Sequence, residues 1–199
     1  KPLSWTEVNM HHICHQIIKK VIKDECSWVE AQATNGPQRP TYFVTHNWSE
    51  PFRDFMLAID LHAAQNGVRM RQTYWICVFA MNQFQVELGT PTELETSSPF
   101  INALKESKAA VLMLDKQGLT LRRIWCLLEV FVVLSKYREL LGWDELFYEI
   151  LTPVGIIGSK NMSSSPLTEA LRTADSTRCK ATFPEDRRLI LNYVAFGAE

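Results

Sequence analysis

The sequence predicts an α/β domain in which a parallel β-sheet lies between layers of helices. Strand-like and helix-like segments alternate along the chain, as they do in parallel α/β sheets with right-handed crossovers. The predicted strand at 73–79 is apolar almost throughout, which is typical of a strand buried on both faces in a parallel sheet. The chain has 199 residues, 46% of them hydrophobic and 22% charged, which suits one domain with a sizeable core. We therefore expect a single domain over residues 1–199, with its core at about 41–152.

The net charge and the cysteines limit the class of protein. The formal net charge is -1, which argues against a nucleic-acid-binding domain. No apolar run is long enough to span a membrane, and the first residues do not form a signal peptide. Lys1 is not a methionine, which is compatible with a fragment of a longer protein. The five cysteines are odd in number and form no Cys-x-x-Cys pair, so we expect free thiols and a cytoplasmic protein.

The first predicted element is an amphipathic helix over residues 5–22, where apolar side chains recur at helical spacing. His11 and His15 lie four residues apart on one face of this helix, where two imidazoles could bind a metal ion. No second cluster supplies the remaining ligands, so we expect no metal here. A turn-rich loop at 31–40 then leads into a predicted strand at 41–46.

The middle of the chain continues the alternation of helices and strands. Pro51 suits the first turn of a helix, and Asn66-Gly67 ends that helix. The predicted elements are a helix at 52–65 with Phe55, Met56, Ile59 and Ala63 facing the core, a buried strand at 73–79, an irregular loop from Met81 to Ser97, a short helix at 98–107 and a strand at 109–115. A loop of that length in a compact domain is usually functional or mobile.

A strongly apolar helix is predicted over residues 121–134, with Thr120 as its N-cap. From the fourth residue of this helix onward, Glu129 is the only charged residue. A carboxylate inside a buried helix needs a partner or a function, because burial raises the free energy of its ionised form. The alternatives are catalysis, an ion pair with Arg122 or Arg123, or a cap for a neighbouring loop.

The remainder of the chain is less regular. A strand is predicted at 146–151, a loop at 155–166, a short helix at 167–174 and a last helix beginning at Pro184. We interpret residues of about 166–196 as a helical extension of the same domain.

Several enzyme signatures are missing from the sequence. It contains no glycine-rich dinucleotide-binding motif, Walker loop, nucleophile elbow or metalloprotease motif. A catalytic pair of Cys126 with His46 can be considered, but no cysteine-protease signature surrounds Cys126. Because Cys126 lies in the first turns of a buried helix, we expect a core position for it. Asp115, which ends a strand, is expected to be a turn residue.

Three segments resemble Toll/interleukin-1 receptor (TIR) domains. Arg53-Asp54-Phe55, on the helix after the first strand, resembles the opening of these domains. The segment from Ser98 to Ser107, followed by an apolar strand, is similar to their second helix and third strand. Trp125-Cys126-Leu127-Leu128-Glu129-Val130 is similar to the Trp-Cys-Leu-x-Glu-Leu that opens the third helix of plant-type TIR domains. The resemblance extends from Thr41 to about Tyr137.

The resemblance implies a flavodoxin-like three-layer fold with about five parallel strands, to which the N-terminal helix and the C-terminal extension are additions. Many TIR domains cleave NAD at the nicotinamide–ribose bond, and others only assemble signalling complexes. The implied function is cleavage of NAD, by hydrolysis or cyclisation, in signalling or defence, with Glu129 as the catalytic residue and no cofactor. The alternatives are a catalytically silent self-association module and a nucleotide sensor without turnover. The resemblance also implies self-association through the Met81–Ser97 loop.

The expected substrate-binding residues follow the first strand and open the central helix, because ligands of parallel sheets bind at the carboxyl ends of strands. They are His46, Asn47, Trp48, Ser49 and Trp125. Trp48 is a candidate for stacking on substrate, with a role as a core plug as the alternative. Nicotinamide leaves as a neutral pyridine, so cleavage does not need a second carboxyl group as proton donor, unlike most glycosidase reactions. One carboxylate that stabilises the oxocarbenium ion is sufficient.

Overall fold

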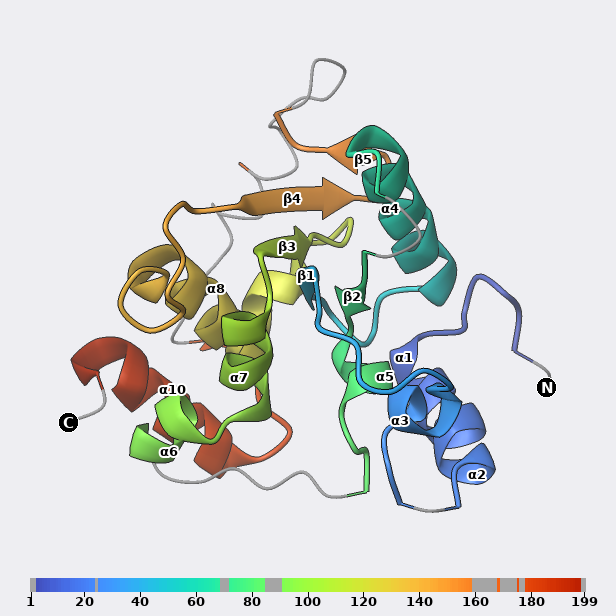
Figure 1. The fold of residues 1–199 in the computed structure, drawn as a ribbon, viewed down its shortest axis with the longest axis horizontal. Coiled ribbons are helices and arrows are strands. Elements are labelled where there is room, and N and C mark those ends of the chain that lie inside the picture. Colours follow the sequence, from blue (N-terminus) through green and yellow to red (C-terminus); the bar gives the residue numbers. More distant parts are fainter. Residues whose placement is uncertain are drawn as a thin grey trace.

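A five-stranded sheet forms the centre of the protein (Figure 1). This computed structural model describes residues 3–23, 25–68, 72–84, 91–158, 168, 175 and 178–197. The strands are β1 (Tyr42–Thr45), β2 (Tyr74–Trp75), β3 (Ala109–Met113), β4 (Tyr148–Thr152) and β5 (Gly155–Ile156). Their order, β2-β1-β3-β4-β5, is that of flavodoxin-like doubly wound sheets. The predicted α/β class is therefore confirmed.

The sheet is mostly rather than wholly parallel. The first four strands pair in parallel, whereas β5 runs antiparallel to β4. The connection between them is a two-residue turn, far shorter than the dozen or so residues that a parallel crossover needs. The hydroxyl of Thr152 donates to the carbonyl oxygen of Gly155 across this turn, at 3.0 Å. The sequence prediction was wrong here, because residues 155 and 156 were assigned to a loop.

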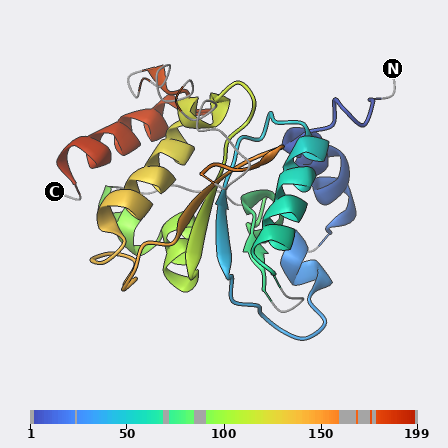
Figure 2. The same cartoon turned by 90° about the horizontal axis from the view of Figure 1, so that it is seen from above.

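Helices cover both faces of the sheet and give the molecule three layers (Figure 2). One layer contains α7 (Pro99–Glu106), α8 (Ile124–Lys136) and α10 (Pro184–Phe196), with the short helix α6 (Pro91–Thr96) packed against α7 and α10. The other layer contains α4 (Phe52–Gln65), α5 (Cys77–Ala80) and the N-terminal helices. Successive strand residues point to opposite faces, so Phe43 packs in the first layer and Val44 in the second.

The N-terminal helix is shorter and less regular than the predicted helix over 5–22. It consists of α1 (Met10–His12), a π-helical segment η1 (Ile13–Ile18) and α2 (Lys19–Val21). The helix begins at Met10 because Asn9 caps it: its side-chain oxygen accepts from the backbone N–H of His12 at 3.2 Å. Asn9 also forms an antiparallel bridge with Pro51, which holds the preceding residues outside the helix.

A short helix between the N-terminal helices and β1 was not predicted. This helix, α3 (Trp28–Gln32), begins with a capping box in which the Ser27 side chain accepts from the backbone N–H of Glu30. It takes up the first two residues of the turn-rich segment at 31–40, which was expected to be a loop throughout.

The second predicted strand, at 73–79, is a strand only at Tyr74–Trp75, and its last three residues are helical. Strand β2 ends at Trp75, and α5 begins two residues later. The turn of helix brings Val78 into the core, where its side chain is fully buried. Packing in the core therefore outweighs the high β propensity of this apolar run.

The predicted loop from Met81 to Ser97 contains α6. Leu94 in this helix is buried in the core, and the hydroxyl of Tyr193 in α10 donates to a carboxyl oxygen of Glu95 at 2.5 Å. Residues 85–90 lie outside the described part of the chain. The second half of the segment thus packs against its own domain.

The central helix α8 begins at Ile124 rather than after Thr120, which was wrongly predicted to be its N-cap. Residues Leu119–Arg122 form a 3-10 helix, η2, and Arg123 has an extended backbone conformation. Arg123 forms a parallel bridge with Lys180, and the backbone N–H of Ile124 donates to the carbonyl oxygen of Lys180 at 3.0 Å. This pairing with a distant segment delays the start of the helix.

Asp115 organises the turn between β3 and η2, as a turn residue does. One carboxylate oxygen accepts from the backbone N–H groups of Gln117 and Leu119, at 3.0 and 3.1 Å. The other accepts from the backbone N–H and the hydroxyl of Thr120, both at 2.7 Å. Gly118 lies within the turn at φ 65, a left-handed conformation that glycine adopts without strain.

Most other predicted helices and strands are observed close to their expected positions. Helix α4 has the predicted bounds, α7 is one residue shorter at each end, β4 lies slightly later and α10 begins at Pro184. In α4, Phe55 and Ile59 are buried as expected, whereas Met56 is exposed and His62 is buried. The helix expected at 167–174 falls outside the described residues except for Thr168.

Two further expectations concern the whole chain. None of the helices within the described ranges is long and apolar enough to cross a membrane. All five cysteines are free thiols in the structure, and three of them are buried.

We predict that Asp115→Asn destabilises the protein by about 1–3 kcal/mol, because an amide offers one acceptor atom where the carboxylate offers two. Thermal or urea unfolding measures this change. Gln117→Ala, which changes an exposed side chain in the same turn, is the matched control and should leave stability nearly unchanged. An Asn variant as stable as the wild type would show that the turn does not depend on the carboxylate.

Candidate functional site

The segments that follow β1, β2 and β3 meet at one end of the sheet, where two cavities adjoin. Sheets of this order bind ligands at the carboxyl ends of the strands, where the winding direction changes between β1 and β3. One cavity has a volume of about 630 Å³ and the other about 610 Å³. Both lie within the size range of small-molecule sites. Their walls share His11, Arg123, Trp125 and Thr182.

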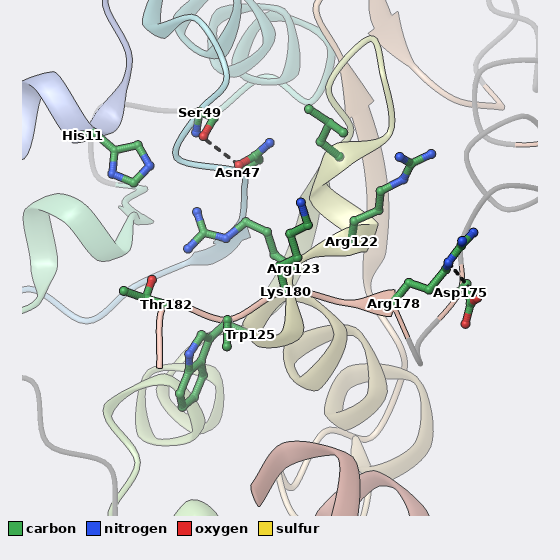
Figure 3. Close-up of a pocket in the computed structure, with 12 residues that line it drawn as sticks. His11, Asn47, Ser49, Arg122, Arg123, Trp125, Asp175, Arg178, Lys180 and Thr182 are labelled. Carbon is green, nitrogen blue, oxygen red and sulfur yellow. Dashed lines mark hydrogen bonds and ion pairs between the residues drawn. The ribbon is translucent and has the colours of Figure 1, made fainter. Parts of the chain in front are cut away.

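The larger cavity, called the aromatic cavity below, is lined by rings and by three carboxyl groups. These residues are His46, Trp48, Phe84, Phe100, Trp125, Phe183, Glu129, Glu185 and Asp186. The smaller one, called the basic cavity, is lined on one side by four cationic side chains (Figure 3). These are Arg122, Arg123, Arg178 and Lys180, with Asp175 as the only carboxylate among the lining residues described. The two cavities therefore differ in chemical character, although Lys19 and Arg123 also line the aromatic cavity.

Glu129 lies in the wall of the aromatic cavity, in the second turn of α8. It is four residues after Trp125 and so shares a helix face with it, which directs both side chains to the cavity. Glu129 is only 5% exposed, and burial raises the pKa of its carboxyl group to about 8. A hydrogen bond with the Thr45 side chain and the charge of Arg123 oppose this shift. A large fraction of this carboxyl group is therefore protonated at neutral pH.

The ion-pair alternative for Glu129 finds no support in the geometry. Within the part of the chain that the structure describes, Glu129 forms no salt bridge with Arg122 or Arg123. Arg122 is exposed in the wall of the basic cavity, away from the carboxyl group. Glu129 is thus a buried acid that retains its proton because of desolvation rather than a member of a buried ion pair.

His46 lies beside a cysteine, but that cysteine is Cys77 and not Cys126. The Nε2 atom of His46 lies 3.3 Å from the sulfur of Cys77. Cys126 instead donates to the carbonyl oxygen of His46, at 3.3 Å, and is buried as predicted. Burial lowers the pKa of His46 to about 3 and raises that of Cys77 to about 12. Both groups are neutral near pH 7, so they do not form the thiolate–imidazolium pair of a cysteine nucleophile.

Trp48 packs on the core and also lines the aromatic cavity, and its stacking on a substrate stays a prediction. Its indole N–H donates to the sulfur of Cys77 at 3.1 Å, and its ring packs against the core under α4. The ring also lines the aromatic cavity and lies 5.3 Å from that of His11, measured between ring centroids. The side chain of Trp48 is therefore half-buried in the cavity wall, and these contacts fix the orientation of its ring.

Trp125 stands between the two cavities. Its ring stacks on Phe100, with 5.0 Å between the centroids, and its indole N–H donates to Asp186 at 3.3 Å. Burial raises the pKa of the Asp186 carboxyl, while the hydrogen bond from Trp125 acts in the opposite direction. Helix α10, which carries Asp186, therefore orients the indole that divides the site.

Asn47 and Ser49 lie in the basic cavity rather than beside Glu129. Asn47 is buried, and its side-chain oxygen accepts from the backbone N–H of Ser49 at 3.1 Å (Figure 3). The six residues predicted for the site therefore divide between the cavities. His46, Trp48 and Glu129 line the aromatic cavity, Asn47 and Ser49 the basic one, and Trp125 both.

Several lining residues were not predicted because they come from distant parts of the chain. The N-terminal helices supply His11, Cys14, His15 and Lys19, and the C-terminal segment supplies Arg178, Lys180, Phe183, Glu185 and Asp186. No local spacing links these residues to Glu129. Arg122 and Arg123, which lie shortly before the tryptophan of the motif, carried a sequence signal, and so did His11 and His15, which were considered only as metal ligands. Although His11 and His15 both line the aromatic cavity, the described residues contain no cluster of three metal-binding side chains.

The beginning of the Met81–Ser97 segment forms part of the cavity wall. The side-chain amide of Gln83 donates to the backbone oxygens of Cys77 at 2.8 Å and of Met81 at 3.3 Å. Phe84 lies below the ammonium group of Lys19, 5.7 Å from it. These contacts hold the first residues of the segment to their own domain, and self-association through the segment stays a prediction.

A second buried acid, Glu50, lies near the site but lines neither cavity. It is 2% exposed, and both of its carboxyl oxygens lack a hydrogen-bond partner among the described residues. Burial, Asp115 and Asp54 together raise its pKa to about 8, against the charge of Lys116. It had no predicted role, and it faces a group of charged side chains at the end of β1 rather than a ligand cavity.

No protein-family model, curated protein or solved structure matches the chain. The site must therefore be interpreted from its own chemistry. Rings with neighbouring carboxyl groups suit a planar cation, and guanidinium groups suit an anion such as phosphate. A ligand that combines both chemistries fits the pair of cavities.

We predict that Glu129→Gln stabilises the protein at high pH. The unfolded chain ionises near pH 4.5 and the folded one near 8, so the wild type loses stability across that interval while the amide does not. The variant should match the wild type near pH 5 and exceed it by on the order of 1–3 kcal/mol near pH 8. Unfolding by urea at both pH values provides the measurement.

Glu139→Gln, which changes an exposed acid, is the control for this experiment and should leave the pH dependence unchanged. A buried ion pair at Glu129 gives the opposite result. Loss of one partner would then destabilise the variant by roughly 3–5 kcal/mol.

Proposed function

We propose that this domain cleaves the nicotinamide–ribose bond of NAD, with Glu129 as the residue that stabilises the transition state. The observation that carries the proposal is a buried carboxyl group without an ion-pair partner among the described residues, in the wall of a cavity lined by aromatic rings. Burial of such an acid lowers the stability of the folded state, and buried acids of this kind are typical of functional sites. The similarity of Trp125 to Val130 to the TIR motif supports the same residue.

The aromatic cavity offers what a nicotinamide ring requires. The oxidised ring is planar and positively charged, and the rings of Trp48 and Trp125 provide surfaces on which such a cation is stabilised. Glu185 and Asp186 add negative charge at the same cavity. A neutral aromatic ligand would gain less from these carboxyl groups.

The raised pKa of Glu129 is compatible with this role because the substrate changes the balance of charge. A bound nicotinamide cation lies close to the carboxyl group and favours its ionised form. The carboxylate then faces the positive charge that develops at the anomeric carbon as the bond breaks. Nicotinamide leaves as a neutral ring, so no proton donor is required, and an acceptor such as water completes hydrolysis.

The neutral pair formed by His46 and Cys77 has no covalent role in this proposal. Its contribution is to complete a dry wall beside Glu129, which strengthens electrostatic interactions within the cavity. A role in signalling or defence follows only from the similarity to TIR domains.

We predict that Glu129→Gln lowers the rate of nicotinamide release from NAD by at least about a hundredfold, because it removes the charge that stabilises the oxocarbenium ion. Glu139→Gln, which makes the same change at an exposed carboxyl group that lines neither cavity, should retain the full rate. Chromatographic measurement of nicotinamide distinguishes the two. A folded Glu129→Gln variant with wild-type turnover would contradict the assignment, and a folded wild type without turnover would favour the silent-module alternative.

We predict that kcat/KM for NAD cleavage rises with pH up to about 8 and then levels off. This parameter reports the free enzyme, in which Glu129 must lose its proton before it can act. By contrast, kcat should reach its plateau at a lower pH, because the bound cation favours the ionised carboxyl group. Nicotinamide release measured from about pH 5.5 to 9 tests both statements. A kcat/KM that stays constant or falls over this interval would exclude a carboxylate with a raised pKa as the active group.

A further inference from the structure

The basic cavity contains more positive charge than its surroundings balance. Its cationic side chains come from Arg122, Arg123, Arg178 and Lys180. Within the described chain, the only ion pair that they form is a loose one between Arg178 and Asp175, at 3.9 Å. The side chain of Arg178 remains 84% exposed. Among the lining residues that the structure describes, four cations and one carboxylate leave an excess of three positive charges around a space of about 610 Å³.

Backbone hydrogen bonds hold the segments that carry these cations next to each other. The N–H of Lys180 donates to the carbonyl oxygen of Arg122 at 2.8 Å, and the N–H of Ile124 donates to that of Lys180 at 3.0 Å. Cys179, the residue before Lys180, is buried, and its carbonyl oxygen accepts a hydrogen bond from the guanidinium group of Arg187 at 3.0 Å. The pairing holds two cationic segments side by side although they are more than fifty residues apart in sequence.

Holding like charges together is unfavourable unless an anion neutralises them. Guanidinium groups bind phosphate oxygens with two parallel hydrogen bonds, which gives both affinity and orientation. Across the cavity from the cations lie Asn47 and Ser49, whose amide and hydroxyl groups provide neutral donors for further oxygens (Figure 3). The cavity thus has the donors of a phosphate site, on two sides of one space.

We propose that the basic cavity is the subsite for the diphosphate of a dinucleotide whose nicotinamide end occupies the aromatic cavity, an inference that rests on the proposed function. The two cavities share Arg123 and Trp125 in their walls, so one ligand can occupy both. The C-terminal segment then belongs to the binding site, because it supplies half of the cations. The domain selects dinucleotides over nicotinamide nucleosides, which carry no phosphate.

The test compares the wild type with the double variant Arg122→Gln/Arg178→Gln. Both residues are exposed, so the variant should fold. Arg123 stays unchanged because its charge also acts on Glu129. The matched control is Arg188→Gln, an exposed arginine of α10 that does not line the cavity. Calorimetric titration with ADP-ribose and inorganic pyrophosphate measures binding without turnover. Nicotinamide riboside contains the scissile bond, so it is titrated into the same three proteins carrying Glu129→Gln as well.

The wild type and the Arg188→Gln control should bind ADP-ribose and pyrophosphate, and the double variant should bind both at least about tenfold more weakly. Nicotinamide riboside should bind all three proteins equally. Equal affinity of the wild type and the double variant for ADP-ribose, or no binding of either phosphate ligand to the wild type, would overturn the subsite.

The two proposals can fail separately. Loss of pyrophosphate binding in the double variant, together with a wild type that releases no nicotinamide, would support the subsite and contradict NAD cleavage. Conversely, NAD cleavage with the same KM in the wild type and the double variant would support the proposed function and contradict the subsite.

Discussion

The parallel pairing of β1 with β3 is the constraint on which the rest of the structure depends. Tyr42 to Thr45 pair with Ala109 to Leu112, and both strands are covered by helices on each face. Because the strands run in the same direction and end together, the segments that leave them lie next to each other. The turn after β1 carries His46 to Ser49, and the turn after β3 leads through Asp115 into η2 and α8. The site is therefore a consequence of strand register, and the hydrogen bonds of Asp115 determine the direction in which the second segment leaves the sheet.

Burial, rather than pairing, determines the electrostatics of the aromatic cavity. Desolvation is the largest cause of the shifts at Glu129, His46 and Cys77, and in each case it favours the neutral form. These buried groups of the cavity are thus neutral, and its other lining residues include the carboxyl groups of Glu185 and Asp186 as well as Lys19 and Arg123, whereas the basic cavity next to it is lined mainly by cations. A ligand with a cationic ring at one end and phosphates at the other complements this division. Arg123 connects the two regions, because it lines both cavities and its charge favours the ionised form of Glu129.

The chain segments outside the alternating core have a direct part in the site. The N-terminal helices contribute one wall of the aromatic cavity, and the segment from Arg178 to Lys180 pairs with the residues that precede α8. That pairing also explains why α8 begins late, since Arg123 is held in extended conformation instead of the first helical turn. The additions to the core therefore shape both the geometry of the candidate site and the secondary structure of the segment that carries Glu129.

The sequence by itself determined the α/β class, the main helices and strands, and the isolated acid in an apolar helix. These follow from local periodicity and from the free energy of burying a single charge, so Glu129 and the polar turn after β1 could be recognised without coordinates. Only the tertiary structure decided what surrounds them. It turned residues 77–80 into a helix because core packing outweighed β propensity, and it placed Cys77 rather than Cys126 beside the imidazole of His46. It also paired Lys180 with Arg123. Contacts between residues so far apart depend on how the helices pack on the sheet, and no spacing in the sequence encodes them.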